Sequence, residues 1–162
     1  MSSDTPYRVC FVCTGNICRS PMAEAVLRRM VAEAGLADRV EVWSAGTGDW
    51  HVGDDADPRT LTTLRDRGYE LAHSAKQWQP DDFDRADLIL ALDRGHYRAL
   101  QRAAPDAADR TKVRLLRSYD ELPGDDLDVP DPYYGDVAGF GRVLDLVEAA
   151  CAGVLKEIRE AL

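Results

Sequence analysis

Cys13 and Arg19 are the residues of this sequence whose types and spacing most directly suggest chemistry. Five residues separate them, and Ser20 and Pro21 follow at once. A loop of this length can wrap a tetrahedral phosphate, with its backbone N–H groups and the next helix N-terminus contacting the oxygens. Arg19 can bind two oxygens bidentately, while Cys13 lies beneath the phosphorus as a thiolate able to attack it. The pattern predicts nucleophilic chemistry on a phosphoryl group.

The residues inside the motif suit a loop that binds phosphate through its backbone. Gly15 and Asn16 are best able to take positive φ, so the chain can curl and direct successive N–H groups at an anion. The residues that we expect to bind phosphate are Thr14, Gly15, Asn16, Ile17, Cys18 and Ser20.

The flanking residues predict a strand before the loop and a helix after it. Residues 9–12 form a continuous apolar run, which is typical of a central parallel strand. Ser20 is expected to cap the helix, and Pro21 suits the first helical position because it has no N–H to satisfy. Met22, Val26 and Met30 then give the helix an apolar face.

The rest of the chain alternates apolar strand patterns with helical ones. Further strands are expected at residues 39–43, 87–92 and 113–116, with helices at 57–68, 93–104 and 141–162, a long loop at 44–53 and an extended segment at 69–77. This order predicts an α/β fold in three layers, a central four-stranded parallel sheet with helices on both faces. The phosphate loop then follows the first strand, at the carboxyl ends of the strands, where such folds bind ligands.

Length and composition indicate one domain, spanning residues 1–162, with a single core. Residues 1–6 lack a basic and apolar leader pattern, and no run approaches the ~18 apolar residues of a membrane span, so we expect a cytoplasmic protein. A net charge of −9 argues against general binding to nucleic acid or anionic membranes. The four cysteines lack zinc-site spacing, and we expect reduced thiols, no metal and no cofactor.

Asp131 is one of many acidic residues of this sequence, and from the residues alone it is only one candidate for the acid that nucleophilic chemistry at Cys13 would need. Pro132 biases it toward an extended backbone, which fixes where its carboxyl group points. If the group that leaves were a phenoxide, whose conjugate acid has a pKa of ~10, a carboxylic acid over the leaving oxygen would protonate it. The resulting carboxylate could then deprotonate the water that hydrolyses the phosphocysteine.

Four segments together resemble the low-molecular-weight protein tyrosine phosphatases. They are residues 12–24 around the loop, Ser44-Ala45-Gly46-Thr47, Leu116-Arg117-Ser118-Tyr119-Asp120 and Asp131-Pro132-Tyr133-Tyr134-Gly135, so the likeness covers nearly the whole chain. The resemblance implies hydrolysis of phosphotyrosine through a phosphocysteine on Cys13, with Arg19 binding phosphate and Asp131 as general acid and base.

The resemblance also implies roles for residues outside the loop. Trp50, Tyr133 and Tyr134 would line the substrate cleft. His73 and Ser44 would support the loop through a hydrogen-bond network with Asn16 and Ser20. Tyrosine-phosphorylated proteins are the implied partners, together with a tyrosine kinase that phosphorylates Tyr133 or Tyr134, and the chain is expected to be a monomer.

Three other functions share parts of this pattern. An arsenate reductase of the same fold needs further cysteines as a shuttle, and none lies between Cys18 and Cys151. A phosphate-binding module without turnover would not need Cys13, Arg19 and Asp131 together. A protein-arginine phosphatase resembles this loop closely, but carries Thr where this chain has Ile17, so we favour phosphotyrosine with phosphoarginine second.

Cys18 suggests a redox hypothesis. It lies five residues after Cys13, and a thiolate oxidises readily to a sulfenic acid that a nearby thiol can capture. A reversible Cys13–Cys18 disulfide would protect the nucleophile. The alternative is that Cys18 simply packs behind the loop.

Overall fold

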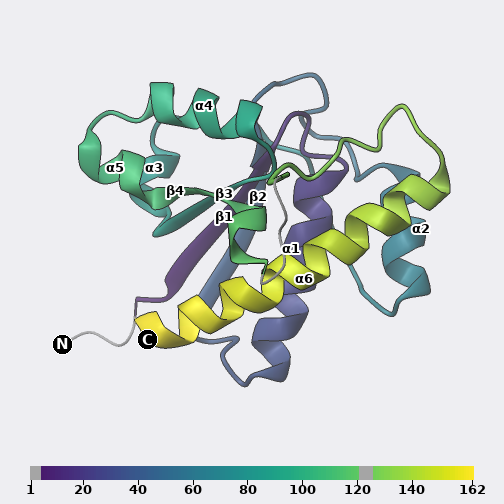
Figure 1. Cartoon of the computed structure of the whole chain (residues 1–162), viewed down its shortest axis with the longest axis horizontal. Coiled ribbons are helices and arrows are strands. Elements are labelled where there is room, and N and C mark those ends of the chain that lie inside the picture. The colour runs from purple at the N-terminus through teal and green to yellow at the C-terminus, as the bar shows by residue number, and fades with distance from the viewer. Residues whose placement is uncertain (1–4, 121–125) are drawn as a thin grey trace.

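The computed structural model describes residues 5–120 and 126–162, and its centre is a four-stranded parallel sheet. The spatial order is β2-β1-β3-β4 (Figure 1), which confirms the predicted sheet. The strands are β1 (Tyr7–Cys13), β2 (Val40–Gly46), β3 (Leu88–Ala91) and β4 (Val113–Leu115). Because β1 is an inner strand, the loop that follows it has neighbouring chain on both sides.

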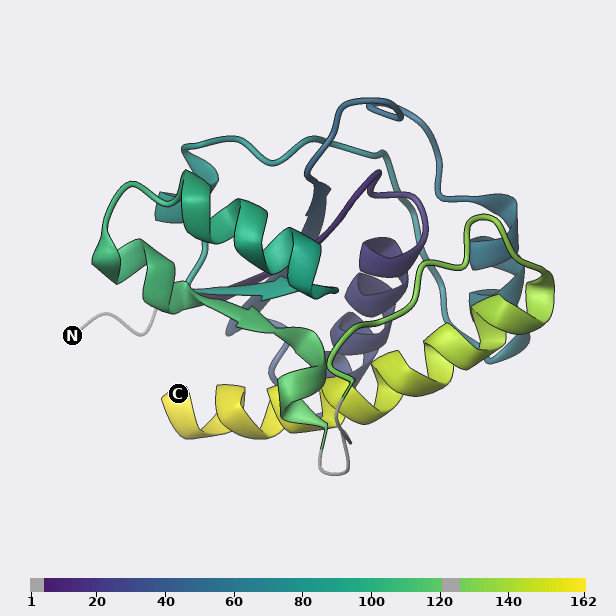
Figure 2. The same cartoon turned by 45° about the horizontal axis from the view of Figure 1, so that its top comes forward.

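Helices cover both faces of the sheet, as the sequence predicts (Figures 1 and 2). The helices are α1 (Arg19–Glu33), α2 (Pro58–Asp66), α3 (Asp82–Arg85), α4 (Arg94–Ala103), α5 (Ala107–Lys112) and α6 (Val137–Ala161), and a 3₁₀ turn, η1 (Leu116–Tyr119), follows β4. Val9 and Phe11 of β1 face the core beneath α1 and α6, and Cys10 and Val12 face the core that holds Leu100 of α4. The three-layer prediction is therefore confirmed.

The apolar run in β1 reflects burial on both faces of the strand. Residues 9–12 are completely inaccessible to solvent. Burying one large apolar side chain contributes about 1.5–3 kcal/mol, so β1 is held firmly on both sides. Cys13, the last residue of β1, inherits this fixed position.

Strand β2 is longer than the sequence pattern indicates. The predicted loop at 44–53 is wrong at its start, because Ser44, Ala45 and Gly46 continue the strand by pairing with Phe11 to Cys13. This pairing brings Ser44 beside the phosphate loop. Gly46 is required there, because a Cβ at this position would lie 2.7 Å from Thr14 O.

Other boundaries differ from the prediction for local reasons. Helix α6 begins at Val137, earlier than the predicted residue 141, because Asp136 caps it by accepting a hydrogen bond from Gly139 N. The fourth strand ends at Leu115 because the 3₁₀ turn begins at the next residue. Helices α3 and α5 were not predicted, since four and six residues are too short to show a helical period.

Gly153 of α6 allows the helix to pack against η1, which gives a test of this packing. An added Cβ at Gly153 would overlap Tyr119 O, so we expect Gly153→Ala to lower the free energy of unfolding by about 1–3 kcal/mol. Gly141→Ala is the matched control, since its nearest neighbour would be Arg67 Nη2 at 3.9 Å and Ala favours a helix by about 1 kcal/mol. Urea unfolding of both variants measures the contrast, and equal stabilities would contradict this packing.

Candidate active site

The loop between β1 and α1 uses its carbonyl groups to hydrogen-bond with the surrounding chain. Its carbonyls accept hydrogen bonds from outside: Cys13 O from Thr47 N at 2.8 Å, Thr14 O from Gly48 N at 3.0 Å and Ile17 O from Asp57 N at 2.8 Å. Within residues 5–120 and 126–162, the N–H groups of residues 14–18 donate no hydrogen bond. Successive free N–H groups in a curled loop form an anion site.

Asn16 makes the turn of the loop, and Gly15 does not. Asn16 has φ of 58°, whereas Gly15 is absent from the glycines with positive φ, so the prediction for Gly15 is wrong. Gly15 serves another purpose, because a Cβ there would lie 2.9 Å from Cδ2 of His51. Asn tolerates the left-handed region better than other residues with side chains, and its amide is used in the site as well.

Ser20 lies inside α1 and does not cap it, which corrects the prediction. The helix begins at Arg19, its N-cap is Cys18, and no side chain makes a capping hydrogen bond. Ser20 lies two residues beyond the N-cap position at Cys18, so its hydroxyl contacts the nucleophile instead. Ser20 Oγ lies 2.9 Å from Cys13 Sγ, and both side chains are buried.

A directed chain of hydrogen bonds ends on the sulfur of Cys13. Ser44 Oγ donates to the carboxylate of Glu24 at 2.6 Å, so its oxygen is available to accept from Asn16 Nδ2 at 2.9 Å. The same Asn16 amide donates to Ser20 Oγ at 2.9 Å. The Ser20 proton is therefore free to point at Cys13 Sγ, which stabilises a thiolate.

Glu24 accepts the first hydrogen bond of this chain, and His73 holds Asn16 at its middle. His73 Nε2 donates to Asn16 O at 2.6 Å, and Lys76 N donates to Asn16 Oδ1 at 2.9 Å, so His73 reaches Ser20 and Ser44 only through Asn16. Glu24 is buried and pairs with Arg28 Nη1 at 2.7 Å. Sequence reasoning missed Glu24, although it lies one helical turn after Ser20 on the same face.

Arg19 is buried at the side of the loop and is already oriented. Its Nη1 donates to Asp93 Oδ2 and to Val129 O, both at 2.9 Å. Its Nη2 lies 3.7 Å from Asp131 Oδ2. With Nη1 occupied, the remaining N–H groups are available to an anion in the cavity.

Asp93 and His96 are site residues that sequence reasoning missed. Burial opposes ionisation of Asp93, but hydrogen bonds from His96 N and Arg19 outweigh it and lower the pKa of the carboxyl. His96 Nε2 shares a 2.8 Å hydrogen bond with Thr14 Oγ1. Burial, with Arg19 nearby, lowers the pKa of His96 to about 4, so the ring is neutral at pH 7. An Asp followed three residues later by a polar residue at a helix start was the available signal.

Asp131 lies at the mouth of the cavity, with its carboxyl group held by the next turn of chain. Tyr133 N donates to Asp131 Oδ1 at 3.0 Å, which leaves Oδ2 facing Arg19. The Asp131 side chain is 46% exposed, so a leaving group and water can both reach it.

Arg59 ties the segment around Asp131 to α2, and the sequence did not reveal it. Its guanidinium donates to both carboxylate oxygens of Asp57, to Tyr133 O at 2.9 Å and to Gly135 O at 3.0 Å. It also lies 4.5 Å from the ring centroid of Phe140. Since Asp57 N also binds Ile17 O, one ion pair connects the phosphate loop with the acid segment.

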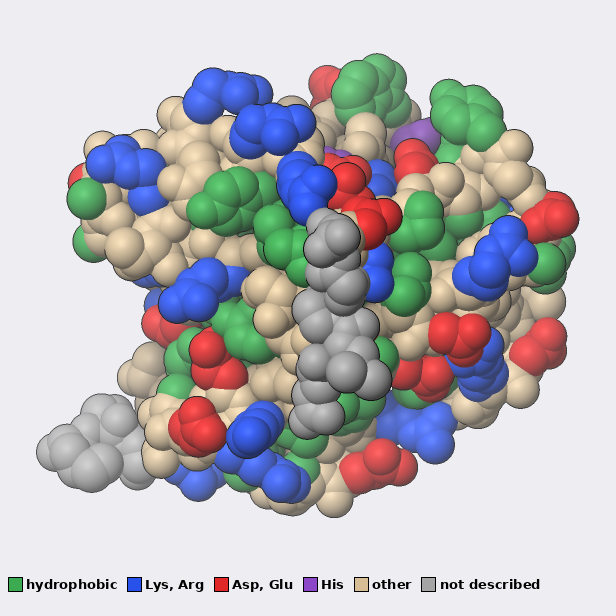
Figure 3. Space-filling model, viewed as in Figure 1, with side chains coloured by type: hydrophobic (Ala, Val, Ile, Leu, Met, Phe, Trp, Pro, Cys, Tyr) green, Lys and Arg blue, Asp and Glu red, His purple; other side chains and the backbone are tan. Residues whose placement is uncertain are grey.

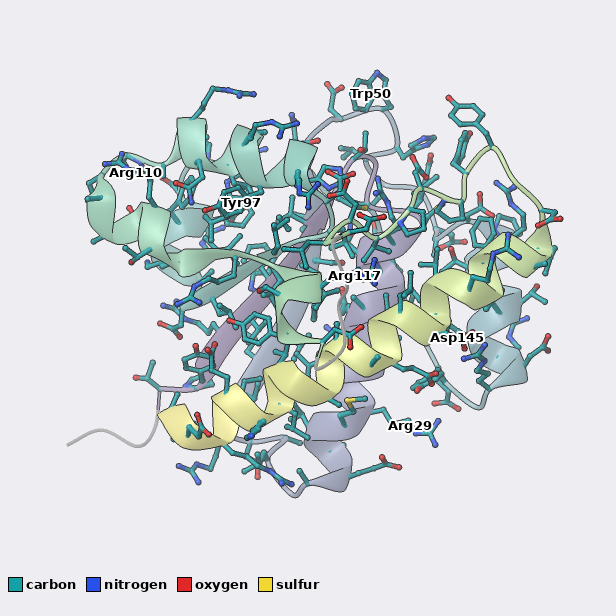
Figure 4. All side chains as sticks on the ribbon, viewed as in Figure 1. Arg29, Trp50, Tyr97, Arg110, Arg117 and Asp145 are labelled. Atoms are coloured by element: carbon teal, nitrogen blue, oxygen red, sulfur yellow. The ribbon has the colours of Figure 1, made fainter. Side chains whose placement is uncertain are left out.

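The cavity over the loop has a volume of about 460 Å³. It is lined by Cys13, Thr14, Gly15, Ile17, Cys18, Arg19, Trp50, His51, Asp131, Tyr133 and Tyr134. Trp50 is 71% exposed and stands at the rim (Figure 4), and Tyr134 is 92% exposed. The Arg19 guanidinium inside the cavity and the aromatic side chains at its rim together suit a phosphate that is carried on an apolar group. His51 was not predicted as a lining residue.

All four cysteines are free and buried. Burial, with Asp57 nearby, raises the pKa of Cys18 to about 12, so its thiol is protonated at neutral pH. Capture of an oxidised Cys13 by Cys18 would therefore require the thiol to lose its proton as the loop rearranges.

Within the part of the chain that the structure describes, no group of three or more His, Cys, Asp and Glu residues could hold a metal ion. No helix there has the length and apolar character needed to cross a bilayer.

Comparison with known proteins gives consistent matches along the chain. The family model for low molecular weight phosphotyrosine protein phosphatases matches residues 8–162. A low molecular weight protein-tyrosine-phosphatase of Streptomyces coelicolor is 62% identical over 95% of this chain and 94% of its own length. A protein tyrosine phosphatase structure from Entamoeba histolytica has a TM-score of 0.91 and 34% identity, and covers 96% of this chain and 98% of its own. The structure of the YwlE arginine phosphatase, known from Bacillus subtilis, has a TM-score of 0.84 and 30% sequence identity, and covers 94% of this chain and 95% of its own.

The neutral, buried His96 predicts a loss of stability in mild acid. Its folded pKa of about 4 lies below the ordinary 6.5, so the unfolded chain binds a proton first as pH falls. The stability is complete above about pH 6.5, and about 2 kcal/mol is lost at pH 5. Urea unfolding at pH 7.5 and pH 5 measures the free energy of unfolding that is lost between these two pH values. This loss should be smaller by about 2 kcal/mol in His96→Gln than in the unaltered protein. An identical loss in the variant would contradict a neutral His96.

Proposed function

The chain belongs to the low molecular weight phosphotyrosine protein phosphatase family and is a protein tyrosine phosphatase, and we propose that it acts through Cys13, Arg19 and Asp131. The observation that carries the proposal is a loop of unpartnered N–H groups that follows directly on Cys13, whose sulfur lies 2.9 Å from the Ser20 hydroxyl. An anion site built around a nucleophile suits transfer of a phosphoryl group.

Phosphate binding falls to the backbone and to one guanidinium. The N–H groups of residues 14–18, with the start of α1, contact the non-bridging oxygens. Arg19 binds two of these oxygens with the edge not used by Asp93. The same donors stabilise the equatorial oxygens of the transition state.

The first chemical step forms a phosphocysteine. The Cys13 thiolate attacks phosphorus in line, the bond from phosphorus to the tyrosine oxygen breaks, and the leaving oxygen takes the proton of Asp131. This role requires Asp131 to be protonated when substrate binds. The arginine phosphatase relative is described as a Cys-to-Ser mutant with a phosphorylated active-site serine, which supports a covalent intermediate.

The second step hydrolyses that intermediate. Asp131, now a carboxylate, takes a proton from water, the hydroxide oxygen bonds to phosphorus, and the bond to Cys13 Sγ breaks. The Ser20 hydroxyl stabilises the thiolate that leaves, so the hydrogen-bond chain from Glu24 assists both steps. Inorganic phosphate then leaves the loop.

The rim supports an aromatic substrate. Trp50, Tyr133 and Tyr134 offer apolar ring surface above the phosphate site. A phenyl ring fills such a slot, whereas phosphoserine is too short to bring its phosphorus to Cys13. Tyrosine-phosphorylated proteins are the proposed partners in signalling. Tyr134, the most exposed of the three, is the better site for a tyrosine kinase.

The remaining features of the proposal concern the protein as a whole. Residues 1–162 form a single phosphatase domain that works as a cytoplasmic monomer, without a metal or cofactor. A Cys13–Cys18 disulfide remains the proposed redox protection, and the high pKa of Cys18 makes its formation slow.

Phosphoarginine is the second candidate substrate, because a relative with arginine phosphatase activity shares the fold. Ile17 is 8% exposed and lines the cavity, where it offers no hydrogen-bonding group. A guanidinium nitrogen beside Ile17 would stay unpaired, at a cost of about 1–3 kcal/mol. The apolar side chain favours a phenyl ring instead.

Substitution of Asp131 tests the proposed mechanism. Asp131→Ala should lower turnover of a phosphotyrosine peptide by roughly 10² to 10⁴, with a much smaller loss on p-nitrophenyl phosphate, whose leaving group is a weak base. Steady-state rates on both substrates measure the contrast. Cys13→Ser is the control. The serine hydroxyl has nearly the same volume as the thiol but forms no accessible anion, so this variant should lose turnover of both substrates. Equal losses for Asp131→Ala on both substrates would show that Asp131 is not the acid.

Substitution of Ile17 tests the substrate preference. Catalytic efficiency for phosphotyrosine and phosphoarginine peptides of the same sequence should favour phosphotyrosine, and Ile17→Thr should shift the ratio toward phosphoarginine by roughly 5- to 150-fold. Ile17→Val keeps an apolar side chain and should leave the ratio close to its original value. A protein that prefers phosphoarginine before any substitution would overturn the specificity.

A further inference from the structure

A basic region covers one end of an otherwise acidic molecule. Residues 94–114 carry six basic and two acidic side chains, so this segment has a charge of +4 and the rest of a chain of −9 has −13. Figure 3 shows Lys and Arg side chains gathered over α4 and α5, at the upper left of the view. A region of positive potential on a negative body attracts acidic groups to one place.

Four exposed arginines make up this region, which we call the α4–α5 basic surface: Arg98, Arg102, Arg110 and Arg114. Within the described residues, none of the four forms an ion pair, whereas arginines of β1, α1 and α2 pair with carboxylates. The two acids of the segment are already engaged, since Asp106 caps α5 and Asp109 pairs with Lys112 at 3.1 Å. The positive charge is therefore not neutralised from within.

Two of the four arginines border a hollow, and the other two lie on the neighbouring helix α4. Arg98 and Arg102 lie one turn apart on α4, opposite the side that buries His96 and Leu100. Arg110 and Arg114 border a hollow of about 500 Å³, whose other walls include Tyr97 and Gln101. Figure 4 shows Tyr97 between α4 and β4, with Arg110 toward the end of the molecule. The surface offers both charge and a place for side chains.

Helix α4 connects this surface to the active site. Its N-cap, Asp93, binds Arg19, and His96 in its first turn binds Thr14 of the phosphate loop. At about 1.5 Å per residue, Arg98 and Arg102 lie roughly 7 and 13 Å beyond Asp93 along the helix. An extended peptide advances about 3.3 Å per residue. A peptide whose phosphotyrosine fills the cavity can thus reach both arginines.

We infer that the α4–α5 basic surface docks an acidic segment of the protein substrate, within a few residues of the phosphotyrosine. This inference rests on the proposed function. Nucleic acid and anionic membrane fit less well, because an extended polyanion would also meet the body of charge −13. A short run of Asp or Glu meets only the arginines. Docking of this kind selects substrates without touching the reacting atoms.

Three phosphotyrosine peptides of equal length test the inference. One carries four Glu residues on the N-terminal side of the phosphotyrosine, one carries them on the C-terminal side, and one has Ser throughout. In low salt, kcat/KM should be roughly 2- to 30-fold higher for one of the acidic peptides than for the Ser peptide. The advantage should vanish in 0.5 M salt, where charges are screened within a few ångströms.

A pair of charge-reversed variants provides the matched control. Arg98→Glu with Arg102→Glu should remove the preference, while hydrolysis of p-nitrophenyl phosphate stays unchanged. Arg142→Glu with Arg159→Glu changes the net charge equally on exposed positions of α6 and should keep the preference. Equal loss in both variants would trace the preference to net charge and overturn the docking surface.

Two further outcomes are separable. The absence of any preference for an acidic peptide overturns the inference, and binding to phosphatidylserine vesicles in its place would assign the surface to a membrane. Failure of the unaltered protein to hydrolyse p-nitrophenyl phosphate would instead overturn the proposed function, whatever the arginines do.

Discussion

The active site depends on the hydrogen bonds of Asn16. Its backbone makes the left-handed turn of the phosphate loop, its carbonyl accepts from His73, and its amide binds Ser20, Ser44 and the backbone at Lys76. The side chain is completely buried, so each lost partner would leave a polar atom unsatisfied. This requirement couples the shape of the loop to the proton that faces Cys13, and the two cannot be changed separately.

The sheet provides the frame in which that network can form. Parallel pairing of β1 with β2 sets Ser44 beside the loop, and burial of β1 on both faces fixes Cys13 at its end. The ion pair of Asp57 and Arg59 then ties the acid segment to the loop from the other side. The residues proposed for catalysis and the residues that position them come from separate parts of the chain, and they thereby share one rigid support.

Local patterns in the sequence were sufficient for the fold and for the residues proposed to carry the chemistry. The apolar run at 9–12 and the alternation of strands and helices predicted the sheet, and the spacing of Cys13 and Arg19 predicted the loop. What could not be predicted depends on contacts between distant residues. Ser44 joins β2 because Phe11 pairs with it, and Arg59 matters only because the chain returns to it about 75 residues later. Roles of this kind leave no periodic signal.

The division of the cavity into a backbone floor and a side-chain rim has a consequence for inhibitor design. The floor consists of N–H groups that any residue in the same loop conformation would present, so a small anion bound there contacts little that is particular to this chain. The rim is made of the Trp50, His51, Tyr133 and Tyr134 side chains, whose identities can differ between proteins with the same loop. A compound that gains its affinity from the phosphate site alone will therefore discriminate poorly, and selectivity must come from groups that extend over the rim.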